Sequence, residues 1–148
     1  GRGSDRPFEQ IGAPWLDTTA VLERLRAMKN DGVSFTGVSF TPVRPGDGKY
    51  ADTLLAGIRL TVTERDSYDP TLTALALFDA IEATAPASFL LTGSRHLIRL
   101  YGGRELERLL GGSEPRAGTG NWRALARNWG TDREAFLARR PPFLLYPP

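Results

Sequence analysis

Few residues of this sequence could perform acid–base chemistry. Glu64 and Asp66 lie two positions apart at the end of a predicted strand, so both side chains could point to one face. Two convergent carboxylates are the pair that glycoside hydrolysis uses, one as the acid and the other as the base or nucleophile. Strand ends commonly carry solvated charges, however, and Arg65 lies between the two. We therefore interpret the pair as surface charge and predict no catalytic residue in this chain.

The single histidine, His96, is the other candidate for a general base near neutral pH. No Gly-x-Ser-x-Gly motif surrounds it, and its context "SRHLIRL" is typical of a turn of helix. With one histidine and no cysteine, the chain cannot form a multi-histidine or thiolate metal site by itself. We expect no metal and no other cofactor.

The most unusual polar residue is Arg2, which stands between two glycines in the opening segment "GRGSDRPFEQIGAPWLD". Gly1 and Gly3 permit unusual backbone angles and close approach, while a guanidinium is a planar fork suited to a carboxylate or phosphate. Ser4 adds a hydroxyl and Asp5 an acceptor. The segment is therefore either a binding loop or a turn with a solvated arginine, and composition alone leaves both open.

Composition excludes several classes of partner. The chain has 148 residues, 41% of them hydrophobic, which suits one globular domain with its own core. Its 19 basic and 17 acidic residues are interleaved, without any run of five like charges, so a nucleic-acid partner is not indicated. No apolar run approaches the ~18 residues of a membrane span, and we expect no membrane insertion.

Hydrophobic periodicity predicts the elements that must position these residues. Asp17 or Thr18 can cap a first helix, and Asp69-Pro70 is a strong start for a second, mostly buried one. Alternating residues predict two strands, the first with a possible bulge at Gly37. In order, we expect a loop at 1–15, a helix at 17–28, a strand at 33–43, a loop at 44–50, a strand at 55–64 and a helix at 70–85.

The C-terminal third is predicted to consist of helices and the connections between them. Two short helices are expected at about 92–101 and 104–110, followed by a flexible connection at 111–120. Trp122 and Trp129 lie seven apart on one helical face, which favours core or interdomain packing over a sugar platform. A capping box at Thr131 predicts a separate helix with Phe136 and Leu137 facing inward. The final "PPFLLYPP" predicts a short edge strand. The fold class is α+β: a small, mainly antiparallel sheet covered by several helices.

Several blocks of the sequence resemble a known family. They are "GRGSDRPFEQIGAPWLD", "VSFTPV" with "KYAD" after it, "GIRLTVTERDSYDP", "LLTG" and "FLARRPPFLLY". In this order they are similar to the C-terminal domain of the bacterial exo-β-N-acetylmuramidases, formerly catalogued as a domain of unknown function. The resemblance spreads over nearly the whole chain, and its first block is the most specific.

The resemblance implies a peptidoglycan glycoside hydrolase that releases N-acetylmuramic acid from non-reducing ends. In that family a Rossmann-like N-terminal domain precedes this one and supplies the catalytic glutamates. Residues 1–148 would then be a single C-terminal domain that covers the cleft and does not hydrolyse substrate alone. A periplasmic or secreted location is implied as well. The alternative is a stand-alone carbohydrate-binding or protein-interaction module without catalysis.

The same resemblance suggests which residues bind a muramoyl saccharide. Arg2, held by the glycines around it, including Gly3, would pair with the lactyl carboxylate of muramic acid or orient a catalytic acid, with Ser4 nearby. Phe8 would stack on a sugar face or pack against the missing domain. Lys49 and Tyr50, from the loop between the strands, would lie at the cleft rim.

Overall fold

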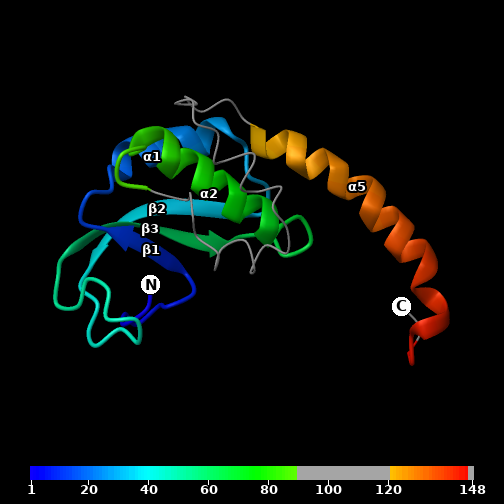
Figure 1. The fold of residues 1–148 in the computed structure, drawn as a ribbon, viewed down its shortest axis with the longest axis horizontal. Coiled ribbons are helices and arrows are strands. Elements are labelled where there is room, and N and C mark those ends of the chain that lie inside the picture. Colours follow the sequence, from blue (N-terminus) through cyan, green and yellow to red (C-terminus); the bar gives the residue numbers. More distant parts are fainter. Residues whose placement is uncertain (90–120, 147–148) are drawn as a thin grey trace.

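The computed structural model describes residues 1–89 and 121–146, with the side chains of 121–128 excepted (Figure 1). In chain order the described elements are strand β1 (Gln10–Ala13), helix α1 (Thr18–Ala27), strands β2 (Val33–Phe40) and β3 (Leu55–Val62), helices α2 (Pro70–Thr84) and α5 (Asn121–Arg139), and a 3-10 turn, η1 (Pro141–Phe143). The predicted helices at 92–101 and 104–110, the connection at 111–120 and His96 lie outside the described residues. The α+β class is confirmed.

The three described strands form one antiparallel sheet in the order β1-β3-β2. Pairing of β2 with β3 is continuous from Val33 opposite Val62 to Phe40 opposite Leu55, so the bulge predicted at Gly37 is wrong. The glycine has a different reason: a Cβ there would lie 2.8 Å from the methyl group of Thr18. Gly37 thus lets α1 approach the sheet closely.

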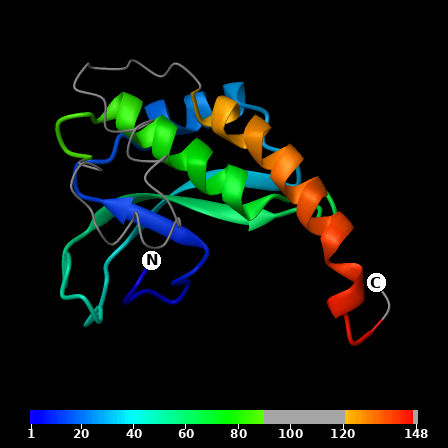
Figure 2. The same ribbon diagram turned by 45° about the vertical axis from the view of Figure 1, so that its right-hand side comes forward.

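Helices α1 and α2 cover one face of the sheet (Figures 1 and 2). The core is built from buried residues of β1, β3, both helices and the connection between β1 and α1, namely Ala13, Leu16, Val21, Leu25, Ile58, Leu75, Ala76, Leu77, Ala80 and Ile81. The alternation of residues along the strands predicted which side chains face this core. Phe35 and Leu60 are opposite one another in register, and both pack against the cluster. The opposite face of the sheet carries no helix among the described residues.

Side-chain caps start both helices of the body. The carboxylate of Asp17 accepts a hydrogen bond from the backbone N–H of Ala20 at 3.0 Å. The carboxylate of Asp69 accepts from Thr71 and Leu72 at 2.9 and 3.0 Å, with Pro70 in the first turn. Both caps are as predicted, and each supplies an acceptor for N–H groups that have no partner inside the helix.

Three further local predictions are wrong. Residues 10–13 form a strand rather than part of a loop, because β3 offers them a paired edge. No separate helix begins at Thr131, because α5 continues through this residue to Arg139. Phe136 and Leu137, which were expected to face inward, are 57% and 41% exposed. The segment after α5 forms the turn η1, since the prolines at 141 and 142 cannot donate to a sheet ladder.

No helix in the described part of the chain combines the length and the apolarity that crossing a membrane requires.

Candidate functional site

The face of the sheet opposite α1 and α2, which we call the open face, forms the floor of the candidate site. Gly12 of β1 and Gly57 of β3 are paired in register on this face. A Cβ at either glycine would come within 2.9 Å of the Phe40 ring, so the two glycines make room for that ring to lie over the sheet. Leu55, opposite Phe40 in register, is 3% exposed and completes the apolar floor.

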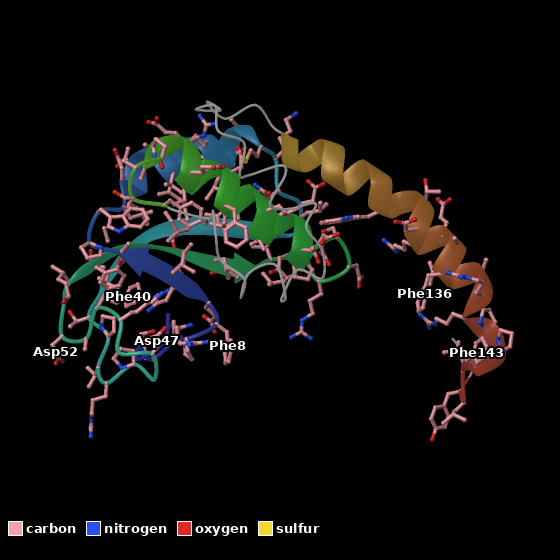
Figure 3. The ribbon with its side chains drawn as sticks, viewed as in Figure 1. Phe8, Phe40, Asp47, Asp52, Phe136 and Phe143 are labelled. Atoms are coloured by element: carbon pink, nitrogen blue, oxygen red, sulfur yellow. The ribbon has the colours of Figure 1, made fainter. Side chains whose placement is uncertain are left out.

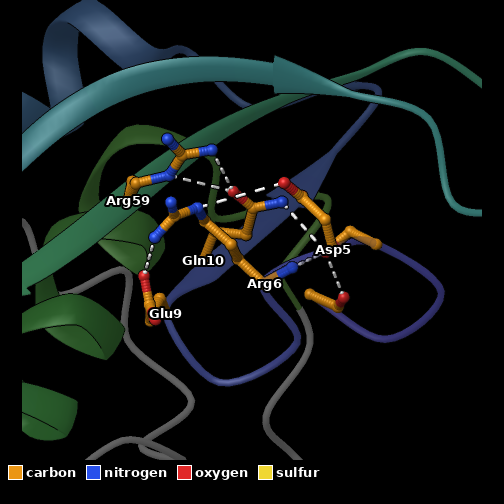
Figure 4. A network of polar contacts seen from close by, with 7 residues as sticks. Asp5, Arg6, Glu9, Gln10 and Arg59 are labelled. Carbon is orange, nitrogen blue, oxygen red and sulfur yellow. Dashed lines mark hydrogen bonds and ion pairs between the residues drawn. The ribbon is translucent and has the colours of Figure 1, made fainter.

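The side chain of Gln10 joins the opening segment to this face (Figure 4). It is 1% exposed, and its amide nitrogen donates to the hydroxyl of Ser4 at 2.9 Å. Its carbonyl oxygen accepts from the guanidinium of Arg59 on β3, at 3.1 Å from Nε and 2.8 Å from Nη2. Buried polar groups require such partners, so Gln10 fixes the position of residues 1–9 on the sheet.

Contacts within the opening segment make it a compact turn. The hydroxyl of Ser4 donates to the carbonyl of Gly1 at 2.6 Å and accepts from the backbone N–H of Arg6 at 3.2 Å. Arg6 in turn donates to Glu9 at 2.7 Å, and this hydrogen bond raises the pKa of the Arg6 guanidinium. The Ser4 hydroxyl therefore takes part in three hydrogen bonds within the chain and stabilises the turn.

The glycines on either side of Arg2 are explained by close approach. A Cβ on Gly1 would lie 2.5 Å from the carbonyl oxygen of Gln10, and Gly3 has a left-handed φ of +78°. The carbonyl of Gly3 accepts from the backbone N–H of Val43 at 2.7 Å, which ties the opening segment to the chain just after β2. The backbone on both sides of Arg2 is thus held against the sheet and the following loop.

The loop between β2 and β3 forms the wall of the candidate site that faces the opening segment. It contains four residues with left-handed φ, namely Arg44, Gly48, Tyr50 and Asp52. Three of these are not glycine, and such conformations cost free energy and cluster at ligand sites. Asp47 accepts from the backbone N–H of Lys49 at 3.2 Å, and its other oxygen lies 3.4 Å from Nη1 of Arg2.

These parts enclose a hollow of about 270 Å³ on the open face, which we call the polar hollow. It is lined by Gly1, Arg2, Gly12, Phe40, Pro42, Asp47, Lys49, Tyr50 and Leu55. Arg2 keeps 70% of its side chain exposed despite its contact with Asp47. Among the described residues no carboxylate lies within 4.0 Å of the Lys49 ammonium. The hollow thus presents two cations and one carboxylate, an arrangement suited to an anionic ligand.

A second hollow of about 240 Å³ adjoins the first and shares Gly12 and Tyr50 with it. The remaining lining residues are apolar or aromatic: Ile11, Ala13, Trp15, Leu16, Phe78, Ile81 and Phe89. The indole N–H of Trp15 donates to the hydroxyl of Tyr50 at 3.4 Å. Tyr50 is therefore the common wall between a polar and an apolar compartment.

The structure brings together three of the six predicted site residues, Arg2, Lys49 and Tyr50. Gly3 supports the backbone beside Arg2 without lining the hollow, and Ser4 is directed to backbone groups and Gln10. Phe8 lies apart from the hollow and is 93% exposed (Figure 3).

The two carboxylates considered as a catalytic pair, Glu64 and Asp66, do not line the polar hollow. Glu64 and Asp66 are exposed in the turn after β3. No group of three or more histidine, aspartate or glutamate side chains within 1–89 and 129–146 is placed to hold a metal ion. The polar hollow offers charged and hydrogen-bonding side chains to a ligand.

Sequence reasoning did not identify Gln10, Arg59 or Asp47. Gln10 and Arg59 are 49 positions apart, and Asp47 is 45 positions from Arg2. The available signal for Gln10 was the alternation in "QIGA", which is too short to outweigh the glycines and prolines around it. For Asp47 the signal was a carboxylate between two glycines in "GDG", which is equally typical of a plain turn.

Comparison with known proteins gives consistent matches. The family model described as "Exo-beta-N-acetylmuramidase NamZ, C-terminal" matches residues 1–146. The curated "Peptidoglycan beta-N-acetylmuramidase NamZ" of Bacillus subtilis (strain 168) is 40% identical over 96 residues, which are 64% of this chain and 22% of that protein. The chain therefore corresponds to a small part of that relative's length.

The fold has a counterpart among solved structures. The crystal structure of a DUF1343 family protein from Bacteroides fragilis NCTC 9343 superposes with a TM-score of 0.79 at 15% sequence identity. The match covers 98% of this chain and 37% of that one. At this level of identity the likeness shows the fold alone.

Proposed function

The chain belongs to the NamZ C-terminal family of exo-β-N-acetylmuramidases, and from this premise we propose that it forms the substrate-binding part of a peptidoglycan glycoside hydrolase. The full enzyme would release N-acetylmuramic acid from the non-reducing end of peptidoglycan fragments. The catalytic carboxylates would come from a further, N-terminal domain, against which this chain packs. Alone, the chain would bind a muramoyl saccharide without hydrolysing it, and a periplasmic or secreted location goes with such a substrate.

The observation that carries this proposal is the pair of cations in the polar hollow. Muramic acid differs from glucosamine by a lactyl ether that bears a carboxylate. Arg2 is largely exposed and its contact with Asp47 is long for a charge-assisted hydrogen bond, so a ligand carboxylate could replace Asp47 at little cost. A hydrogen bond between a ligand carboxylate and a guanidinium contributes ~1.5–3 kcal/mol.

The second part of the argument is the aromatic wall beside the cations. Tyr50 borders the polar hollow and is held by the indole of Trp15. Aromatic side chains with a polar tip combine apolar contact area with a hydrogen bond. A saccharide with its carboxylate at Arg2 would place part of its ring against Tyr50, with Lys49 at the rim.

The test compares two substrates in the full-length enzyme. We expect Arg2→Ala to reduce kcat/KM for a muramoyl substrate by about 10- to 150-fold, the equivalent of one charge-assisted hydrogen bond. A glucosaminyl analogue without the lactyl group should lose much less. Arg2→Lys keeps the charge but not the planar fork, and should retain part of the preference for the muramoyl substrate.

Arg65→Ala is the matched control, because Arg65 is an exposed arginine outside the hollow. It should leave both substrates unaffected. Equal losses on both substrates in Arg2→Ala would refute recognition of the carboxylate and assign Arg2 a structural role.

A further inference from the structure

Aromatic residues recur every seven positions along the last helix and the turn that follows it. They are Trp122, Trp129, Phe136 and Phe143. Seven residues make almost two turns of an α-helix, so positions at this spacing within α5 follow one side of it with a drift of only about 20° per step. We call this set the aromatic stripe. The first three positions belong to α5, and Phe143 belongs to η1.

At Trp129 the stripe lies against the body of the domain, and from there it continues beyond it. Trp129 is partly buried and packs against the core cluster. From Gly130 to Arg139 every residue is exposed. Phe136 and Phe143 are 57% and 83% exposed, and both lie on the part of α5 and η1 that projects away from the sheet (Figures 1 and 3). The turned view shows the same projection (Figure 2).

A helical segment of this kind has little to stabilise it in water. Helices in proteins derive most of their stability from packing an apolar face, and short isolated helices are marginal. Here ten consecutive residues have no buried side chain, although the segment carries large apolar groups. Leu137, Leu145 and Tyr146 add to the exposed apolar surface at 41%, 92% and 81%. Large apolar side chains that gather on an exposed segment are typical of an interaction site.

We infer that the exposed part of the aromatic stripe is the surface on which the remaining part of the full-length protein packs. The inference rests on the proposed function only in taking the chain to be one part of a longer enzyme. Its support is the continuity of the stripe with the packed residue Trp129, together with the length of the relatives. The matched regions are only 22% and 37% of those two longer chains.

Hydrogen exchange tests the inference directly. Backbone amides of residues 130–143 would be measured in the full-length protein and in the 148-residue chain alone. We expect exchange to be at least about tenfold slower in the full-length protein, because packing adds to the free energy of local opening. Equal rates in the two proteins would overturn the inference.

A charge introduced into the stripe gives a second, independent readout. Phe136→Asp should lower the thermal stability of the full-length protein and expose the junction to protease, while leaving the unfolding temperature of the 148-residue chain nearly unchanged. Leu54→Asp is the control, since Leu54 is 69% exposed and lies outside the stripe. It should have little effect in either protein. An equal effect of both variants in the full-length protein would overturn the inference.

The alternative occupant is a second copy of the chain. Sedimentation of the 148-residue chain would then show a dimer that Phe136→Asp dissociates, and that result would also overturn the inference. Failure of the proposed function is distinguishable: loss of muramoyl recognition with residues 130–143 still protected would refute the function and leave this interface standing.

Discussion

The two ends of the described chain show opposite ways of placing apolar and polar groups. The opening segment is nearly without apolar core residues, yet Gln10, Ser4 and the glycines hold it on the open face through short hydrogen bonds and close backbone contacts. Helix α5 carries large aromatic residues, yet from Gly130 onward none of them is buried. The opening segment is held by contacts within the described chain, whereas the exposed part of α5 has the composition of an interface.

The largest expected effect comes from breaking the polar anchor of the opening segment. Gln10→Leu should reduce the free energy of unfolding by about 3 kcal/mol, because it removes the acceptor of two charged hydrogen bonds and the donor to Ser4 in a buried position. Urea denaturation of the 148-residue chain measures it. A loss below about 1 kcal/mol would show that the segment is held by its backbone contacts alone.

A smaller loss of stability is expected at Gly3, beside Arg2, where both the backbone conformation and a close contact disfavour a side chain. Gly3→Ala should cost about 2 kcal/mol, since φ is left-handed and the new Cβ would lie 3.0 Å from the backbone oxygen of Val43. Gly48→Ala is the matched control: φ is +67° there, but no atom lies within 4 Å of the added Cβ. It should cost about 1 kcal/mol. Equal losses in the two variants would mean that contact with Val43 is unimportant.

The body of the domain holds a third kind of site, a charge buried between helices. Asp79 on α2 is 8% exposed, and Nη2 of Arg24 lies 3.8 Å from its Oδ2. Within the part of the chain that the structure describes, neither Oδ2 of Asp79 nor Nε of Arg24 has a hydrogen-bond partner. Burial raises the pKa of Asp79, and the attraction of Arg24 offsets this only in part. Burial therefore makes the ionised carboxylate of Asp79 less favourable in the folded protein than in the unfolded chain.

The raised pKa of Asp79 determines how the stability of the fold should change with pH. A carboxyl group with a raised folded pKa stabilises the fold fully at pH values below its unfolded pKa, and this contribution is lost as the pH rises through the folded pKa. Asp79→Asn should therefore melt at a higher temperature than the parent at neutral pH, with the difference vanishing near pH 3. Asp66→Asn, in an exposed turn, should show no such trend. A lower melting temperature for Asp79→Asn at neutral pH would show that the Arg24 pair is net stabilising.

Local signals predicted the body of this fold well, and distant pairings account for what they missed. The caps at Asp17 and Asp69 and the alternation in β2 and β3 each depend on a few adjacent residues. Strand β1 depends on pairing with residues 43 to 49 positions away, which its four residues do not reveal. At Thr131 a local signal was misleading: a capping-box pattern can also occur inside a helix, and α5 continues through it.

The candidate site shows the same contrast between what local sequence indicates and what depends on contacts between distant residues. Arg2, Lys49 and Tyr50 could be selected for their chemistry and their resemblance to a family, and they line one hollow. Their arrangement depends on Asp47, Gln10 and Arg59, which meet only after β1, β2 and β3 have paired. Residue chemistry and family resemblance could select residues that line the hollow, but local sequence could not reveal contacts between residues 45 to 49 positions apart.

The smallest expected effect sharpens the contrast between the ends. Phe136→Ala should change the free energy of unfolding of the 148-residue chain by no more than about 0.5 kcal/mol, the range of exposed substitutions. The same change at a fully buried phenylalanine typically costs about 3–5 kcal/mol. The difference arises because Phe136 is 57% exposed and leaves no cavity when it is truncated. Denaturant unfolding, with Leu25→Ala as the buried reference at 1% exposure, provides the scale. A loss for Phe136→Ala comparable to that of Leu25→Ala would mean that α5 already packs fully within this chain, and the contrast between its two ends would disappear.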